Sequence, residues 1–202
     1  LAEAVDQLAE RHSPNRSVLI GHSIGGMLAL RVASETRVPL AGVEVSGLGE
    51  RWQPGLREMW ASLIGDAPEV SVPAEAHAQV MFGPAGTFDS EQITRDRDLL
   101  RPMPMPELVD VVDWSHALPS VAARIDVSVG LTLAEHDGIW QSDLESRSAL
   151  AARFTACPSV RIDLFPGAGH CIELHRGARA YCLRQLAFVE EALEASAKVS
   201  LA

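Results

Sequence analysis

The sequence predicts an α/β domain built around a mostly parallel sheet. Two observations carry this prediction: helical patterns alternate with short, largely apolar runs, and the first of these runs is continuous in the way of a strand covered on both faces. The 202 residues are 47% hydrophobic and 22% charged, which is the composition of a globular chain able to bury a sizeable core.

The spacing of apolar residues predicts the first elements. Leu1, Val5 and Leu8 share one face at helical spacing, and that pattern stops before Ser13-Pro14-Asn15. The elements expected before residue 48 are a helix over 1–12, a strand over 17–20 that is covered on both faces, a helix over 24–35 and a strand over 40–45.

Residues 49–118 interrupt this pattern with seven of the twelve prolines and three of the four tryptophans. The excursion is far longer than an ordinary connection, so we expect a helical lid or cap here, inserted into a core made of 1–48 and 119–202. The pattern then resumes with strands over 127–133 and 160–164, a helix over 142–154 and a long last helix whose expected apolar face is Leu183, Leu186, Val189 and Leu193.

Charge and cysteine content limit the classes of partner. A formal net charge of −10 argues against nucleic acid and against an anionic membrane surface. The longest apolar stretch, 24–30, is too short to cross a bilayer, and the first dozen residues lack the features of a signal peptide. Cys157, Cys171 and Cys182 have no metal-ligand spacing and fit reduced thiols. We therefore expect a cytoplasmic protein with no bound metal.

The string Gly21-His22-Ser23-Ile24-Gly25-Gly26 lies where the first strand meets the second helix. A nucleophile on such a turn needs unusual backbone angles, and the close approach of strand and helix leaves no room for side chains two residues away on either side. Gly21 and Gly25 fit that need. We therefore predict that Ser23 is a nucleophile and that the Ile24 N–H, at the start of the helix, donates to an oxyanion.

A serine nucleophile needs a general base and a carboxylate that orients the base. Glu135 and Asp137 follow an apolar strand, at the edge where open parallel sheets bind ligands. We expect the Glu135 side chain to point away from a loop aimed at His170, and Asp137 to face the base. His170 follows the next strand through a Gly-x-Gly turn and is the predicted base. Asp163 lies within that strand, where we expect a solvated or edge position.

The chain resembles the α/β-hydrolase superfamily, in its lidded serine hydrolase subgroup, through GHSIGG at 21–26, LAEHD at 133–137 and PGAGH at 166–170. The order serine, acid, histidine along the chain is the order of that architecture. The resemblance implies that Asp137 is the acid, that no cofactor takes part, and that a second oxyanion donor comes from a loop ahead of the nucleophile helix. Because that loop would precede Leu1, we expect the C-terminal portion of the fold, completed by an N-terminal segment or a partner chain.

Aromatic side chains and one histidine are the candidate substrate contacts. Trp52, Trp60 and Trp114 lie in the expected lid, where they either line an apolar pocket or form the lid's own core. His22 adjoins Ser23, and we expect it to contact the substrate or to pack beneath the turn. His175 is expected to cap or pack near the last helix.

The predicted function is a serine hydrolase that cleaves an ester, thioester or lactone of a small, largely apolar substrate through an acyl-enzyme on Ser23. An acyltransferase or cyclase would use the same triad. A rival from another class is an incomplete or non-catalytic α/β-hydrolase-like subunit, because the strand over 17–20 would present an unpaired edge.

Overall fold

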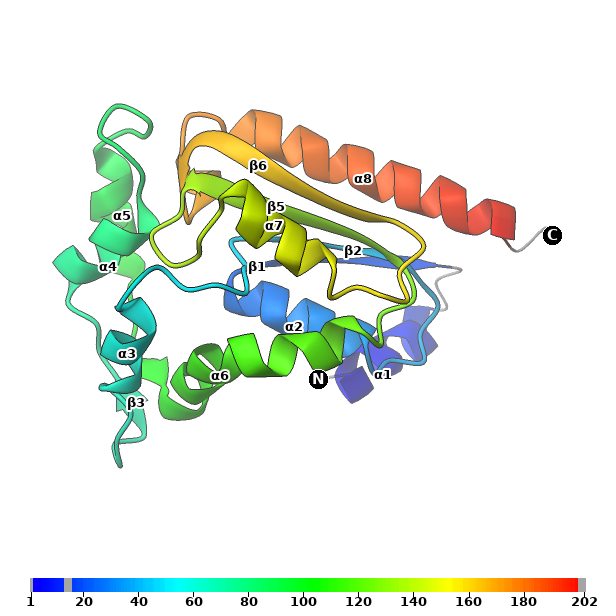
Figure 1. Cartoon of the computed structure of the whole chain (residues 1–202), viewed down its shortest axis with the longest axis horizontal. Coiled ribbons are helices and arrows are strands. Elements are labelled where there is room, and N and C mark those ends of the chain that lie inside the picture. The colour runs from blue at the N-terminus through cyan, green and yellow to red at the C-terminus, as the bar shows by residue number, and fades with distance from the viewer. Residues whose placement is uncertain (1, 13–15, 200–202) are drawn as a thin grey trace.

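A four-stranded parallel sheet forms the centre of the computed structural model, which describes residues 2–12 and 16–199 (Figure 1). The strands lie in the order β1-β2-β5-β6. Their bounds are Ser17–His22 for β1, Leu40–Ser46 for β2, Ser128–His136 for β5 and Val160–Gly169 for β6. The prediction of an α/β fold with a mostly parallel sheet is therefore confirmed. Leu1 and Ser13-Pro14-Asn15, which the sequence assigns to the first helix and its end, lie outside the described residues.

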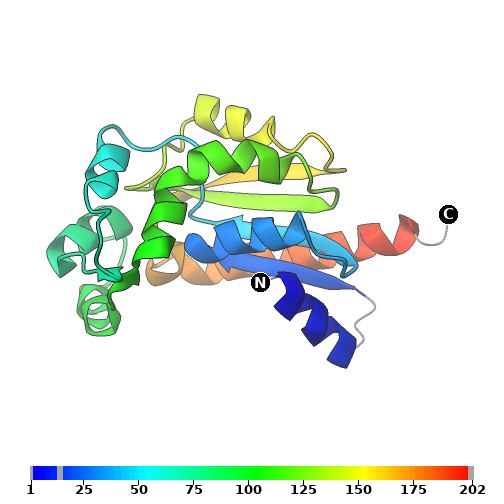
Figure 2. The same ribbon diagram turned by 90° about the horizontal axis from the view of Figure 1, so that it is seen from below.

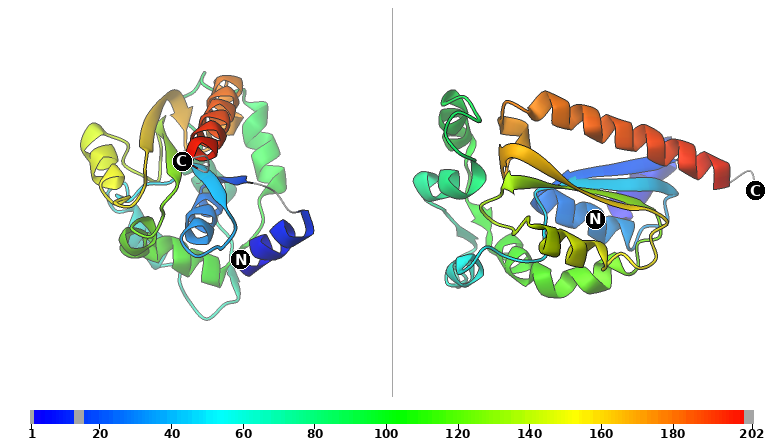
Figure 3. Two further views of the ribbon diagram at one scale, coloured as in Figure 1. Left: turned by 90° about the vertical axis from the view of Figure 1, so that its right-hand side faces the viewer. Right: turned by 45° about the horizontal axis from the view of Figure 1, so that its top comes forward.

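Helices cover both faces of the sheet (Figures 2 and 3). Helix α8 packs against β1 and β2 on one face, and α2, α6 and α7 lie on the other, with α1 packed against α2. The bounds are Ala2–His12 for α1, Ile24–Ala33 for α2, Met105–Ala122 for α6, Leu144–Ala151 for α7 and Ala178–Val199 for α8.

The buried face of α8 differs from the one that the sequence predicts. Leu183 and Leu186 are each 58% exposed, whereas Phe188 and Ala192 are buried and form a small cluster with Ala41 of β2. Gly42 makes room for this contact, because a Cβ there would lie 3.0 Å from the Cβ of Ala192 and 3.2 Å from the ring of Phe188. The aromatic ring thus packs over glycine backbone. Of the four residues predicted to be apolar contacts, Leu183 and Leu186 face solvent, whereas Val189 is half-buried and Leu193 packs against this cluster.

Strand β1 is less covered than expected. Its residue Val18 packs with the α8 cluster and Leu19 packs against the main core on the other face. Ile20, however, is 52% exposed. The prediction of a strand covered on both faces is therefore wrong at Ile20. Among the described residues β1 pairs only with β2, so its other edge is open.

The segment predicted as a lid gathers beyond one end of the sheet, at the left of Figures 1 and 2. It contains α3 (Leu56–Ala61), β3 (Glu69–Val70), α4 (Ala74–Met81), α5 (Glu91–Leu99) and β4 (Met103–Pro104), with β3 and β4 paired antiparallel. Side chains of this segment share the main hydrophobic cluster with the sheet. Helix α6 continues without a break across residue 118, the expected boundary, to Ala122.

Candidate active site

The backbone at Ser23 has the strained geometry expected of a serine on a strand-to-helix turn. Ser23 links β1 to α2 with φ 52° and ψ −120°, and among the described residues it is the only non-glycine with positive φ. Its N–H donates to the Ser46 carbonyl at 2.9 Å, and its own carbonyl accepts from the Gly26 and Met27 N–H groups. These bonds hold a conformation that a β-carbon disfavours.

The glycines around Ser23 have different roles. A Cβ on Gly21 would meet the backbone of Gly25 and lie 2.7 Å from the Gly26 nitrogen, so only glycine fits there. Gly26 also faces a neighbour, since a Cβ would lie 3.3 Å from the Cβ of Val45. Gly25 is exposed, and a Cβ there would meet nothing within 4 Å. The expected steric need for glycine is thus correct at Gly21 and wrong at Gly25.

A chain of hydrogen bonds joins three side chains that are far apart in the sequence. His170 Nε2 lies 2.9 Å from Ser23 Oγ, and His170 Nδ1 lies 3.1 Å from Asp137 Oδ2. An ionised carboxylate only accepts hydrogen bonds, so the proton of the neutral ring resides on Nδ1 and Nε2 is free to accept from the serine hydroxyl. The side chains of His170 and Asp137 are almost completely buried, at 1% and 0% exposed.

The loop after β5 holds the Asp137 carboxylate in place. Asp137 Oδ1 accepts from the Ile139 and Trp140 backbone N–H groups at 2.8 and 3.0 Å. Gln53 donates from its side-chain amide to the Asp137 carbonyl at 2.9 Å, which ties the segment after β2 to this loop. Glu135, the competing acid, points elsewhere and accepts from the Gly167 N–H at 2.8 Å. The two carboxylates therefore point to different places. Residues two apart on a strand would share a face, and these side chains diverge because β5 ends at His136 and Asp137 lies in the loop beyond it.

A second polar cluster lies against His170. The rings of His22 and His170 are 5.1 Å apart, and His22 Nδ1 lies 2.9 Å from Ser46 Oγ. Ser46 in turn donates to Glu173 Oε1 at 3.3 Å. Burial, and then the neighbouring His170, lower the pKa of His22, which keeps its ring neutral at pH 7. His22 thus borders the His170 ring and is hydrogen-bonded to the end of β2.

Sequence patterns did not single out three residues that surround His22 and His170, namely Ser46, Gly47 and Glu173. Ser46 ends β2 at the same sheet edge as Ser23, and the next residue, Gly47, has φ +58°. A Cβ on Gly47 would lie 2.7 Å from the His22 ring and 3.0 Å from the His170 ring. A glycine directly after a parallel strand is a signal that could have pointed to this site. Glu173 has no comparable signal, since its role depends on the path of the chain after His170.

The three candidate tryptophans occupy different environments. Trp114 is completely buried in the main hydrophobic cluster, so it lies in the core rather than at a cavity. Trp52 is 8% exposed, and its ring lies 4.6 Å from that of Trp140 and 6.0 Å from that of Trp60. Trp60 lines an apolar cavity in the predicted lid segment.

The remaining candidate side chains lie outside the hydrogen-bonded chain. Asp163 is in the edge strand β6 and pairs with Arg161 at 3.2 Å, in agreement with the expected edge position. His136 has a partly exposed side chain 3.7 Å from Glu135. His175 is 4% exposed and bonds backbone groups, as described below.

A family model described as the alpha/beta hydrolase family matches residues 1–181, which is most of the chain and spans the serine, acid and histidine described above. The chain belongs to the α/β-hydrolase family. The matched residues include the strained turn at Ser23 and the loops that carry Asp137 and His170. The resemblance drawn from the three motifs is therefore confirmed at the level of the family.

Solved α/β-hydrolase structures share this fold. A monoacylglycerol lipase of Paleococcus ferrophilus is 19% identical with a TM-score of 0.66, over 96% of this chain and 74% of its own. A soluble variant of monoglyceride lipase from Saccharomyces cerevisiae is 14% identical with a TM-score of 0.67, over 94% of this chain and 66% of its own. A carboxylesterase of Bacillus subtilis is 18% identical with a TM-score of 0.57, over 93% and 65%. At these identities the likeness establishes the fold.

A search of curated protein sequences finds no match to this α/β-hydrolase. Within residues 2–12 and 16–199, no helix combines the length and the apolar character needed to cross a membrane.

Proposed function

We propose that this α/β-hydrolase is a serine hydrolase that cleaves esters, thioesters or lactones through an acyl-enzyme on Ser23. The observation that carries the proposal is the chain of hydrogen bonds from Ser23 Oγ through the His170 ring to Asp137, at 2.9 and 3.1 Å. A serine of ordinary acidity is a weak nucleophile, and an adjacent base with an oriented ring activates it. The lipases and esterases among the structural neighbours are consistent with this chemistry.

In the proposed reaction, His170 Nε2 removes the hydroxyl proton as Ser23 Oγ attacks the carbonyl carbon. The oxyanion forms beside the Ile24 N–H, which belongs to the first turn of α2 and has no acceptor within the helix. The imidazolium then gives its proton to the leaving group, and the acyl group remains on Ser23. Water, activated by the same ring, releases the acid. An acceptor alcohol in place of water would make the enzyme an acyltransferase, and an acceptor within the substrate would make it a cyclase.

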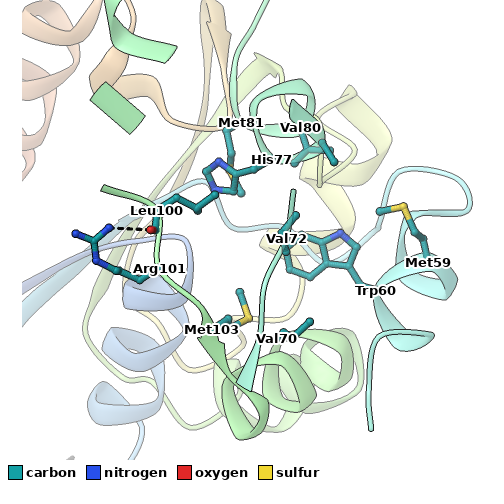
Figure 4. A pocket seen from close by; sticks show the side chains of 11 residues that line it. Met59, Trp60, Val70, Val72, His77, Val80, Met81, Leu100, Arg101 and Met103 are labelled. Carbon is teal, nitrogen blue, oxygen red and sulfur yellow. Dashed lines mark hydrogen bonds between the residues drawn. The ribbon is translucent and has the colours of Figure 1, made fainter. Parts of the chain in front are cut away.

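An apolar cavity supports a small, largely apolar acyl group as the substrate class. The cavity has a volume of about 90 Å³, and Figure 4 shows the side chains around it, including Trp60, Val72, Val80 and Met103. Met81 also lines it, and the Met81 carbonyl accepts from the N–H of the residue after His170 at 3.1 Å. An apolar cavity of about 150 Å³ holds benzene, so a cavity of about 90 Å³ would take only a short acyl chain.

We also propose that the open edge of β1 pairs with a further strand, from a preceding segment or a partner chain. Ile20 is 52% exposed there, and an unpaired strand edge favours association with another strand. Such a strand would bring the second oxyanion donor that family resemblance places ahead of the nucleophile helix. Expressed alone, this chain is expected to self-associate in sedimentation experiments, and Ile20→Lys is expected to reduce that association. A monomer that reacts with a fluorophosphonate probe and hydrolyses a short-chain ester at a normal rate would refute the proposal.

The catalytic proposal is tested by labelling with a fluorophosphonate probe. Ser23→Ala is expected to abolish labelling, while the control Ser142→Ala, a serine in the loop after β5, is expected to label as the parent does. His170→Ala is expected to reduce turnover of a short-chain ester by about a thousandfold or more with the fold intact. Labelling that persists in Ser23→Ala would refute the assignment of the nucleophile.

A further inference from the structure

His175 bonds three backbone groups from inside the molecule. Its Nε2 accepts from the Gly83 N–H and from the Gly169 N–H, both at 2.9 Å. Its Nδ1 lies 2.8 Å from the Cys171 carbonyl, and since a carbonyl only accepts, Nδ1 carries the proton. The ring is therefore the neutral Nδ1–H tautomer, and it uses both nitrogens.

These bonds join two segments that matter to the proposed catalysis. Gly169 directly precedes His170, and Gly83 follows α4, whose last residue Met81 lines the apolar cavity. The two segments are in backbone contact, because a side chain on Gly169 would run into the backbone of Phe82 and Gly83. The His175 imidazole thus adds two hydrogen bonds to the Cys171 N–H to Met81 carbonyl bond at 3.1 Å, and together they hold the loop of the proposed base against the wall of the proposed acyl pocket.

The surroundings of His175 disfavour a charged ring. Phe82 and Phe88 lie against it, with ring centroids 5.9 and 5.6 Å away. Among the charged and titratable groups around it, Glu173 of η1 (Ile172–Leu174) favours protonation and His136 at the end of β5 opposes it. Burial is the largest influence and lowers the pKa of His175 below its ordinary value of 6.5. Arg176, the next residue along the chain, forms an exposed ion pair with Asp89 at 3.1 Å, so these two charges offset each other.

We propose that neutral His175 is a positioning residue that latches the Met81–Gly83 segment to the loop of His170, and that its protonation in mild acid opens the latch and withdraws His170 from Ser23. This inference rests on the proposed function of that triad. A protonated Nε2 carries a hydrogen and cannot accept, so two buried N–H groups would lose their partner and would face a positive charge. The acid limb of activity would then include the opening of the latch.

Hydrogen exchange separates the latch from catalysis. The Ser23→Ala protein is followed between pH 5 and pH 8 in peptides covering residues 82–88 and 166–172, with rates corrected for intrinsic exchange. Protection of the Gly83 and Gly169 amides is expected to fall about tenfold for each pH unit below the pKa of the His175 ring. His175→Gln supplies a carbonyl acceptor and an amide donor that do not titrate, so its protection is expected to stay constant. The control His116→Gln, at an exposed histidine paired with Asp113, is expected to keep the parent's pH response.

Activity provides the second measurement. His175→Leu leaves both N–H groups without an acceptor, and kcat is expected to fall by about tenfold to a hundredfold at all pH values, with KM changed less. His175→Gln is expected to recover most of that loss and to show a shallower acid limb. Protection that is independent of pH in the parent, or a pH response that persists in His175→Gln, would overturn the latch.

The outcomes for the latch and for the triad are distinct. If fluorophosphonate fails to label Ser23 while exchange behaves as expected, the proposed function fails and the latch stands. If labelling succeeds and exchange does not respond to pH, only the latch fails. Should His175→Gln not fold, nitrogen NMR of the parent's His175 ring decides: the Nδ1–H tautomer with a titration midpoint below pH 6.5 supports the latch, and the Nε2–H tautomer at pH 8 overturns it.

Discussion

Glu44 is a buried carboxyl whose removal is expected to stabilise the protein at neutral and alkaline pH. It lies in β2, is 3% exposed and faces α8. Its Oε2 accepts from Gln185 at 2.7 Å and its Oε1 accepts from the Tyr181 hydroxyl at 3.4 Å. Burial raises the pKa of Glu44 from 4.5 to about 7, although both hydrogen bonds act to lower it. The perturbation is Glu44→Gln, which keeps the shape and removes the charge.

The size of the effect follows from the two pKa values. Between pH 4.5 and about 7 the folded protein retains a proton on Glu44 that the unfolded chain has lost, so stability falls as the pH rises through this window. A shift of about 2.5 units corresponds to about 3 kcal/mol. The amide introduced by Glu44→Gln carries no charge, and if Gln185 turns its own amide around, the Gln185 oxygen accepts from the introduced NH₂ group. The variant is therefore expected to lack this loss of stability.

Urea unfolding at pH 5, 6, 7 and 8 measures the effect. The free energy of unfolding of Glu44→Gln minus that of the parent is expected to rise by about 2.5 kcal/mol between pH 5 and pH 8, because part of the loss already occurs below pH 5. The lowered pKa values of His22 and His175 make stability fall as the pH drops below 6.5, but they do so in both proteins and cancel in the difference. Glu190→Gln, at another position of α8, is the control and is expected to show a flat difference. A flat difference for Glu44→Gln would refute the reasoning.

Three further substitutions test the site and its support. Asp137→Asn is expected to lower kcat about ten-thousandfold with little loss of stability. Two backbone N–H groups hold the oxygen of the introduced amide, so its NH₂ group faces His170 and forces the ring into the tautomer that cannot accept the serine proton. A kcat near that of the parent would contradict this. Gly21→Ala is expected to destabilise the protein by about 1–3 kcal/mol in urea unfolding, whereas Gly25→Ala, in open space, is expected to be neutral or slightly stabilising; equal effects would be inconsistent with the packing. Val80→Phe is expected to shift a panel of acyl esters toward shorter chains, while Val109→Phe, 43% exposed on α6, is expected to leave the profile unchanged; a profile that does not move in Val80→Phe would separate the cavity from the acyl site.

Local patterns were enough to predict the framework and the main candidate side chains. The turn at Ser23 can be predicted because a strand, a strained residue and a helix must follow one another within a few residues. Gly21 indicates the close contact between the strand and the helix. Asp137 and His170 could be expected to lie near Ser23 because parallel strands end at one edge of the sheet. The same reasoning predicted a steric role for Gly25 that the open space around it does not support.

Patterns along the chain could not decide which surfaces meet. Leu183 and Leu186 of α8 satisfy helical periodicity and are nevertheless exposed, whereas Phe188 is buried because Gly42 and Gly130 of the sheet leave room for its ring. Ile20 belongs to an apolar run and is nevertheless half exposed, because coverage depends on what lies beside the strand. Periodicity predicts that a helix or strand has an apolar face, but only the packed structure shows which element covers that face.

The sequence by itself determined the α/β order of elements, the strained serine turn and the set of side chains from which the proposed triad is drawn. Each of these depends on the spacing of residues within one element or on the order of strands. Tertiary structure alone decided the apolar cavity, the burial of Glu44 and the three backbone bonds of His175. These depend on contacts between segments that are distant along the chain, and the energy of a buried polar group is set by the partners that folding brings to it.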